Sequence, residues 1–158
     1  MHNIFNTLSR IFTSNKSKFK FQIPQGYYQT EEQFQSNEVS VYNANLMLAF
    51  RATTARPYKG SIHKVLTISN KIAEESLKEI FNNPKIIKKG ISNFYSGKSI
   101  YYHLQTSKIK NEDFDFFICY FIYHYDKQIL IVFSTKKENY SIVMPEVFKV
   151  LSTLKLLD

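Results

Sequence analysis

The last third of the chain, residues 114–158, constrains the fold most strongly. It contains two apolar, aromatic-rich runs, residues 114–125 and 129–135, with a short polar turn at residues 126–128 between them. Aromatic and β-branched residues favour strands, so this pattern predicts a long antiparallel hairpin. A short amphipathic helix is predicted next, over residues 145–157, because a proline in its first turn precedes an apolar stripe. The block therefore predicts a hydrophobic core, and it carries no catalytic motif.

The residues before this block add further strands and one more helix. Residues 19–23 alternate apolar with polar side chains, which is the period of a strand with one solvated face. Further strands are predicted over residues 39–42, 46–52, 62–68, 85–95 and 98–105. Residues 53–60 are predicted to form a basic loop, and residues 71–82 a central helix that ends before Pro84. This order predicts an α+β fold, an antiparallel sheet of about six to seven strands with the central helix and the C-terminal helix packed on it.

Residues 3–13 predict an additional amphipathic helix at the N-terminus. Their apolar side chains recur at helical spacing, and a basic run follows them. Three interpretations remain open: a helix that packs on the body or frays, a segment that lies on an anionic membrane surface, or a transit-type segment. The resulting organisation is an N-terminal amphipathic segment over residues 1–16 and a single domain over residues 17–158.

Three local patterns carry a resemblance to a known fold. The opening strand runs into a Pro-x-Gly-aromatic turn at residues 21–27, a tyrosine-rich strand returns as an aliphatic strand over residues 120–133, and a helix closes the chain at residues 148–156. Together these patterns resemble the PsbP-like fold superfamily over about residues 17–158. This superfamily includes PsbP, DcrB-like proteins and the effector-associated chaperones of type VI secretion. The resemblance implies binding to other proteins and not catalysis.

The net charge of +8 is concentrated in blocks without acidic residues, over residues 1–30, 39–73 and 80–111. Such blocks predict a positive surface toward an acidic protein, an anionic lipid or a nucleic acid, or only a solubilising charge. Tyrosine and arginine are typical anchors of protein interfaces. The candidate partner-binding residues are Arg51, Arg56, Tyr58, Lys59, Lys64, Lys88, Lys89 and Lys98.

No motif predicts an enzyme, a cofactor site or a metal site. None of the four histidines has a carboxylate or a second histidine three or four residues later. The single cysteine, Cys119, and His124 lie in an apolar strand, where we expect architectural roles. Asp113 and Asp115 share a strand face, and we expect them to be solvated. Phosphate-loop, dinucleotide and nucleophile-elbow motifs are missing.

These observations lead to a functional hypothesis and an alternative. The hypothesis is a non-catalytic protein-binding module, a chaperone or immunity-type partner of a secreted bacterial protein, that recognises an acidic protein. The alternative is a peripheral membrane-surface protein acting through residues 3–13, or a nucleic-acid-binding protein acting through its basic segments. The sequence lacks a signal peptide, a lipobox cysteine and an apolar run of ~20 residues, which predicts a cytoplasmic location.

Overall fold

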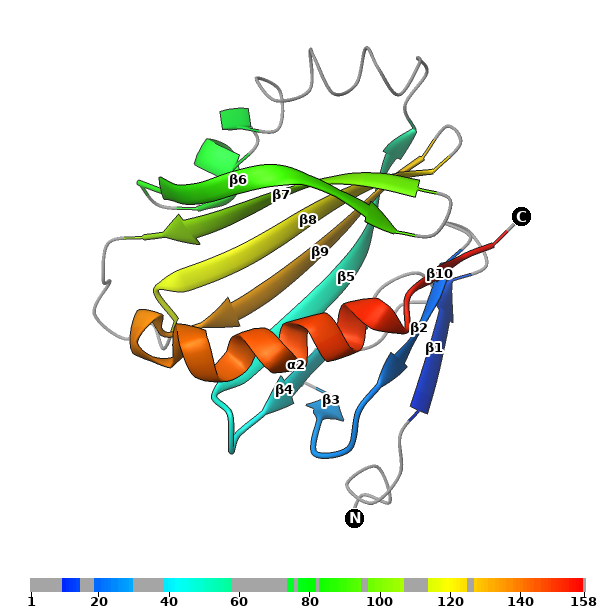
Figure 1. Cartoon of the computed structure of the whole chain (residues 1–158), viewed down its shortest axis with the longest axis horizontal. Helices are drawn as coiled ribbons and strands as arrows, with labels where there is room; N and C mark the ends of the chain where they lie inside the picture. Colours follow the sequence, from blue (N-terminus) through cyan, green and yellow to red (C-terminus); the bar gives the residue numbers. More distant parts are fainter. Residues whose placement is uncertain are drawn as a thin grey trace.

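Ten strands in two antiparallel sheets and one long helix make up most of the described structure (Figure 1). The computed structural model describes residues 10–14, 19–29, 39–57, 74–75, 77–81, 83–94, 97–106, 114–124 and 127–157. At residues 10, 29, 53–57, 93–94, 97–98, 123–124 and 127–128 only the backbone is described.

The larger sheet has seven strands in the order β3-β4-β5-β9-β8-β7-β6. These strands are β3 (Tyr28–Gln29), β4 (Val39–Asn43), β5 (Leu48–Pro57), β6 (Lys85–Phe94), β7 (Gly97–Gln105), β8 (Phe116–His124) and β9 (Lys127–Thr135). Each described neighbour pair is antiparallel. β5 therefore lies beside β9, which is far from it in sequence, and β3 and β6 form the two edges.

The smaller sheet joins the two ends of the described chain. Its order is β1 (Arg10–Ser14), β2 (Phe19–Ile23) and β10 (Lys155–Leu156), again antiparallel. The helix α2 (Tyr140–Ser152) lies across the larger sheet and leads directly into β10 (Figure 1). α2 and the smaller sheet thus cover the same face of the larger sheet.

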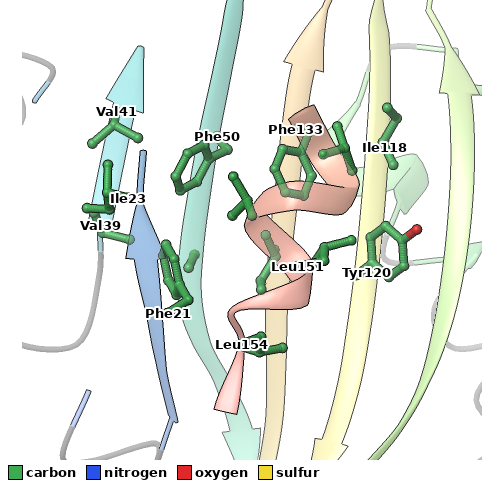
Figure 2. Close-up of a cluster of buried hydrophobic side chains, with 14 of the residues drawn as sticks. Phe21, Ile23, Val39, Val41, Phe50, Ile118, Tyr120, Phe133, Leu151 and Leu154 are labelled. Atoms are coloured by element: carbon green, nitrogen blue, oxygen red, sulfur yellow. The ribbon is translucent and has the colours of Figure 1, made fainter. Parts of the chain in front are cut away.

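Two hydrophobic clusters hold these layers together, one on each face of the larger sheet. The first joins β2, β4, β5, β8 and β9 to α2, and Figure 2 shows Phe50, Phe133 and Leu151 within it. The second contains Leu77, Ile100, Tyr102, Leu104, Cys119 and Phe121. Successive side chains of a strand point to opposite faces, so β8 supplies both clusters. The expected aromatic hairpin is confirmed as this two-sided core element.

The turn of the aromatic hairpin was predicted over residues 126–128, but β9 already begins at Lys127. His124 of β8 pairs with Lys127 of β9, which leaves residues 125–126 as the connection. Lys127 and Gln128 therefore belong to β9 and not to the turn, because both residues pair with β8.

The C-terminal helix begins earlier than its sequence predicted. A short 3-10 turn over Lys137–Asn139 precedes α2, and Pro145 lies inside the helix, not in its first turn. The Asp115 carboxylate accepts a hydrogen bond from the Lys137 backbone N–H at 2.9 Å, so it caps the start of this helical segment. Asp115 is only 9% exposed, which corrects the expectation of a solvated carboxylate. The helix ends at Ser152 because the chain then pairs as β10.

The predicted N-terminal helix over residues 3–13 is wrong in its described part. Residues 10–14 form β1, and residues 1–9 lie outside the described residues. The side chain of Phe12 packs between Phe19 and Phe21, with ring centroids 5.9 and 5.6 Å apart, while Ile11 is exposed. Pairing with β2 thus outweighs the helical spacing of the apolar residues. The proposed division at residue 16 remains a prediction.

Two further expectations concern the middle of the chain. Residues 53–57 were predicted as loop but continue β5, where Thr53 and Thr54 pair with β9. Of the central helix, residues 74–75 and 77–80 are described and helical, with Leu77 buried on the second cluster. The strand predicted over residues 62–68 lies outside the described residues.

Candidate partner-binding strand

The structure describes only part of the predicted partner-binding set. Tyr58, Lys59 and Lys64 lie outside the described residues, and the backbone alone places Arg56 in β5 and Lys98 in β7. The side chains of Arg51, Lys88 and Lys89 are described, and all three are exposed.

Arg51, Lys88 and Lys89 do not form one patch. Arg51 lies on β5 and the two lysines on β6, with β9, β8 and β7 between the two strands. At ~4.8 Å per strand, β5 and β6 are about 19 Å apart. Lys88 pairs with His103 and Lys89 with Tyr102, so the two lysines point to opposite faces of the sheet. Among the predicted residues whose side chains are described, the structure brings only Lys88 and Lys89 together, on a single strand.

That strand, β6, is an edge of the larger sheet as the described residues form it. It pairs with β7 from Lys85 to Phe94, with a register shift at Ile87, and no described strand pairs with its other side. Ile86, Ile87 and Ile91 are 38%, 50% and 58% exposed. An edge strand presents a row of unpaired backbone N–H and C=O groups to any chain that can align with it. β6 therefore offers main-chain N–H and C=O groups with which another strand could pair, together with exposed apolar side chains.

The charge of β6 is entirely positive. Its charged residues are Lys85, Lys88 and Lys89, and the strand contains no acidic residue. The Lys89 ammonium lies 3.2 Å from a carboxylate oxygen of Glu74, which links β6 to the helical residues that begin there. Such an exposed pair contributes at most about 1 kcal/mol. Lys85 and Lys88 have no carboxylate partner among the described residues.

A glycine–tyrosine pair supports the middle of β6. Gly90 lies opposite Tyr101 of β7, and a Cβ atom placed at Gly90 would approach the Tyr101 hydroxyl oxygen to 2.5 Å and its Cζ to 2.7 Å. The tyrosine ring therefore lies across the glycine. This arrangement covers a backbone position that has no side chain of its own, as aromatic residues do beside edge glycines.

Substitution of Gly90 tests this packing. Gly90→Ala is expected to lower the free energy of unfolding by about 1–2 kcal/mol, because the added methyl displaces the Tyr101 ring. In a Tyr101→Leu background the same change is expected to be neutral or slightly stabilising, because alanine then only restricts the unfolded chain. Urea denaturation of the four proteins in this cycle measures the difference. An equal cost in both backgrounds contradicts the proposed contact.

A buried histidine lies on β7, the strand next to β6, and its side chain is on the face of the larger sheet that α2 covers. His103 of β7 is 3% exposed, and its Nδ1 lies 2.9 Å from the Tyr140 hydroxyl at the first residue of α2. Its ring also contacts Tyr101 and Phe116, with centroids 5.6 and 6.3 Å apart. Burial first and the positive charge of Lys88 second lower the pKa of His103 to about 4. The histidine is therefore neutral at pH 7 and connects β7 to the helix.

The other perturbed groups also belong to the packing. Burial raises the pKa of the Cys119 thiol, as expected for an architectural cysteine, and raises the pKa of Tyr120 to about 12. The Tyr27 hydroxyl donates a hydrogen bond to the Glu146 carboxylate at 3.2 Å, and burial first and that carboxylate second raise its pKa. Within the described residues, no three histidine, cysteine or carboxylate side chains gather as a metal site. No described helix is long and apolar enough to span a membrane.

The sequence contained a sign that this strand exposes apolar side chains, which the charge pattern alone did not reveal. The run Lys85-Ile86-Ile87-Lys88-Lys89 does not alternate apolar with polar residues, although it was expected to form a strand. A strand with apolar residues on both faces is either buried or exposes some of them. Here the strand is at an edge and exposes three isoleucines, which sequence reasoning did not include.

Comparison with known proteins shows similarity at the level of structure. No protein-family model and no curated protein matches the sequence. The solution structure of PsbP (CyanoP) from Synechocystis sp. PCC 6803 has a TM-score of 0.67 at 9% identity, covering 94% of this chain and 92% of that chain. The Ran-binding protein Mog1p from Saccharomyces cerevisiae has a TM-score of 0.62 at 8% identity, covering 96% of each chain. A mutant of protein Mog1 has a TM-score of 0.62 at 10% identity, covering 96% and 97%.

The similarity spans nearly the whole chain and agrees with the element order derived above. At such low identities it concerns the fold alone. The expected α+β architecture is confirmed, with its antiparallel sheet and C-terminal helix. This chain therefore has the PsbP-like fold.

Proposed function

We propose that this protein is a non-catalytic protein-binding module of the cytoplasm, and that its partner adds an acidic, extended segment to β6. One observation carries the proposal: within the sheet that the described residues form, β6 is an edge strand with three exposed isoleucines and no acidic residue. Addition of a strand supplies main-chain hydrogen bonds for affinity, and alternate side chains supply specificity. A chaperone or immunity-type partner of a secreted bacterial protein is the form of this function that we favour.

The lysines favour a partner of opposite charge over a second copy of this chain. An antiparallel copy of β6 on the same edge would place lysines near lysines, and like charges on facing strands are unfavourable. Lysines are also the residues that protect sheet edges from self-association. In a segment that alternates acidic with apolar residues, the carboxylates form ion pairs with Lys85 and Lys88, and the apolar side chains cover the isoleucines.

The structural neighbours agree with this class of function. Mog1p is by name a Ran-binding protein, so the same fold serves protein binding in at least that case.

A designed peptide tests the proposal directly. The probe is a fluorescent peptide of about eight residues in which glutamate alternates with valine, the length of one strand. We expect saturable binding that weakens as salt is added. Ile91→Ser and Lys88→Glu are each expected to weaken binding about tenfold, because each removes one of the two kinds of contact. Fluorescence anisotropy measures the affinities.

Matched substitutions on α2 serve as controls. Ile142 is 62% exposed and Lys149 is also exposed, so Ile142→Ser and Lys149→Glu change the same chemistry away from β6. Both are expected to leave binding within about twofold. A peptide with N-methyl groups on alternate amides is expected to bind at least about tenfold more weakly, because it cannot pair with a strand edge.

Three results would contradict the proposal. The first is equal weakening by the β6 and the α2 substitutions. The second is unchanged binding of the N-methylated peptide. The third is binding of a single-stranded oligonucleotide or of anionic vesicles that the Lys88→Glu change reduces while the acidic peptide does not bind. This last result would favour the nucleic-acid or membrane alternative.

A further inference from the structure

The smaller sheet, formed by β1, β2 and β10, contains a pocket on its outer face. Its volume is about 260 Å³, and it is lined by Ile11, Lys20, Phe21, Gln22, Thr153 and Lys155. These residues come from β1, β2, β10 and the turn between α2 and β10. The pocket thus forms where the two ends of the described chain meet.

Two lysines lie side by side in this pocket. Lys155 of β10 pairs directly with Lys20 of β2 in the antiparallel register. Side chains at paired positions have Cβ atoms about 5 Å apart, and like charges so placed repel each other. Lys20 is half-buried, and no described carboxylate forms an ion pair with either ammonium. The arrangement therefore favours a negatively charged ligand over an empty pocket.

The wall of the pocket is held by hydrogen bonds. The Gln22 backbone N–H donates to the Thr153 hydroxyl oxygen at 2.9 Å, and that hydroxyl donates to the Val150 carbonyl at 2.8 Å. These bonds tie β2 to the last turn of α2 and fix the point where Lys155 begins. Lys20 and Lys155 are consequently presented from paired strands of the same sheet, not from mobile loops.

An apolar side chain completes the pocket. Ile11 on β1 is 71% exposed, although its neighbour Phe12 packs inward on β2. Ile11 pairs with Gln22, one position along the same outward face from the Lys20 pair. A ligand with a doubly charged head and a small apolar group therefore matches both the lysines and Ile11.

We infer that this pocket binds a phosphate monoester. Such a group carries about −1.5 to −2 charges at neutral pH and offers three acceptor oxygens, which suit two adjacent ammonium groups. Lysine is a common phosphate ligand that acts as a point charge. The organic group attached to the phosphate lies against Ile11. This inference does not depend on the proposed function, since it concerns another sheet and another ligand.

Titration of the intact protein with phenyl phosphate tests the inference. At constant ionic strength, we expect amide chemical-shift changes at residues 20–22 and 153–155, and a higher melting temperature, because the ligand binds the folded state. Lys20→Gln and Lys155→Gln are each expected to weaken binding about fivefold to tenfold, and the double variant to remove it. Ile11→Ser is expected to weaken phenyl phosphate but not inorganic phosphate.

Lys149→Gln is the matched control, because it removes one exposed positive charge of α2 outside the pocket. It is expected to change affinity by less than about twofold. Flotation with vesicles that contain phosphatidate, a lipid with a phosphomonoester head, distinguishes a membrane source of the group from a soluble one. Loss of flotation in the double lysine variant assigns the lipid, and binding of phenyl phosphate without flotation assigns a soluble ligand.

The inference is overturned if phenyl phosphate does not bind at about 10 mM, or if the double variant binds it as well as the natural sequence does. Thermal denaturation of each variant without ligand shows whether it is folded. Since Lys20 and Lys155 face outward and repel each other, we expect both variants to be at least as stable as the natural sequence. Failure here leaves the peptide binding of β6 unaffected, so the two proposals are tested separately.

Discussion

Phe50→Ala is expected to lower the free energy of unfolding by about 3–5 kcal/mol. Phe50 is 1% exposed and lies at the centre of the larger cluster (Figure 2). Its ring contacts those of Phe21, Tyr27 and Phe133, with centroids 5.7, 5.3 and 5.5 Å apart. These contacts join β2 and the turn after it to β5 and β9, so truncation opens a cavity between the two sheets.

Thermal and urea denaturation measure this effect. For a chain of 158 residues, the expected loss corresponds to a fall in melting temperature of about 10 °C. Phe50→Leu retains most of the volume and is expected to cost less than half as much. Phe148→Ala is the control, because Phe148 is 57% exposed on α2, and it is expected to change stability by no more than about 0.5 kcal/mol. Equal losses for Phe50→Ala and Phe148→Ala would mean that the cluster is not the main core.

Acidification from pH 7 to pH 4 is expected to remove about 2–3 kcal/mol of stability through His103 alone. The pKa of this histidine is lowered from 6.5 to about 4 in the folded protein. Between these two values the unfolded chain binds a proton that the folded protein does not bind. Stability therefore increases with pH across this window, and is lost as pH falls through about 6.5 toward 4.

His103→Phe isolates this contribution from the carboxylates that titrate nearby. Phenylalanine fits an aromatic cluster that already contains Phe116 and Tyr140, and it does not bind a proton. At pH 7 the variant is expected to lose about 1 kcal/mol, because the Tyr140 hydroxyl no longer has its ring-nitrogen partner. Between pH 6.5 and pH 4 it is expected to be less sensitive to pH than the natural sequence. Parallel pH profiles for the two proteins would contradict the lowered pKa.

Much of the fold could be predicted because local and global preferences agree in these segments. The strands at residues 19–23 and 116–135 alternate or are strongly apolar, and their turns are short and polar. The element order was sufficient to suggest the PsbP-like fold. In each case, the same apolar residues that favour a strand locally are also the residues that the fold buries.

The failed predictions are those in which tertiary pairing outweighs local spacing. Residues 3–13 have apolar residues at helical intervals, yet the described part of this segment lies in β1, where Phe12 packs on β2. Pro145 is typical of a first helical turn, yet α2 begins five residues earlier because the Asp115 carboxylate, distant in sequence, caps the segment before it. Neither the partner strand nor the distant cap can be read from the local sequence.

The same limit applies to the candidate sites. Charge patterning identified Lys88 and Lys89 but could not show that β6 is an edge, because strand order depends on pairings between distant segments. It grouped Arg51 with them, although three strands lie between. The pairing of Lys20 with Lys155 joins residues near opposite ends of the chain, and no sequence pattern connects the two.

The sequence by itself determined that the segment from Phe114 onward is a core hairpin with a closing helix, because apolar periodicity specifies which side chains leave water. It also determined the excess of positive charge. Only the tertiary structure decided where that charge meets an unpaired strand edge and where two lysines face each other. Those positions follow from the order and register of strands, which are determined by packing between segments that are far apart along the chain.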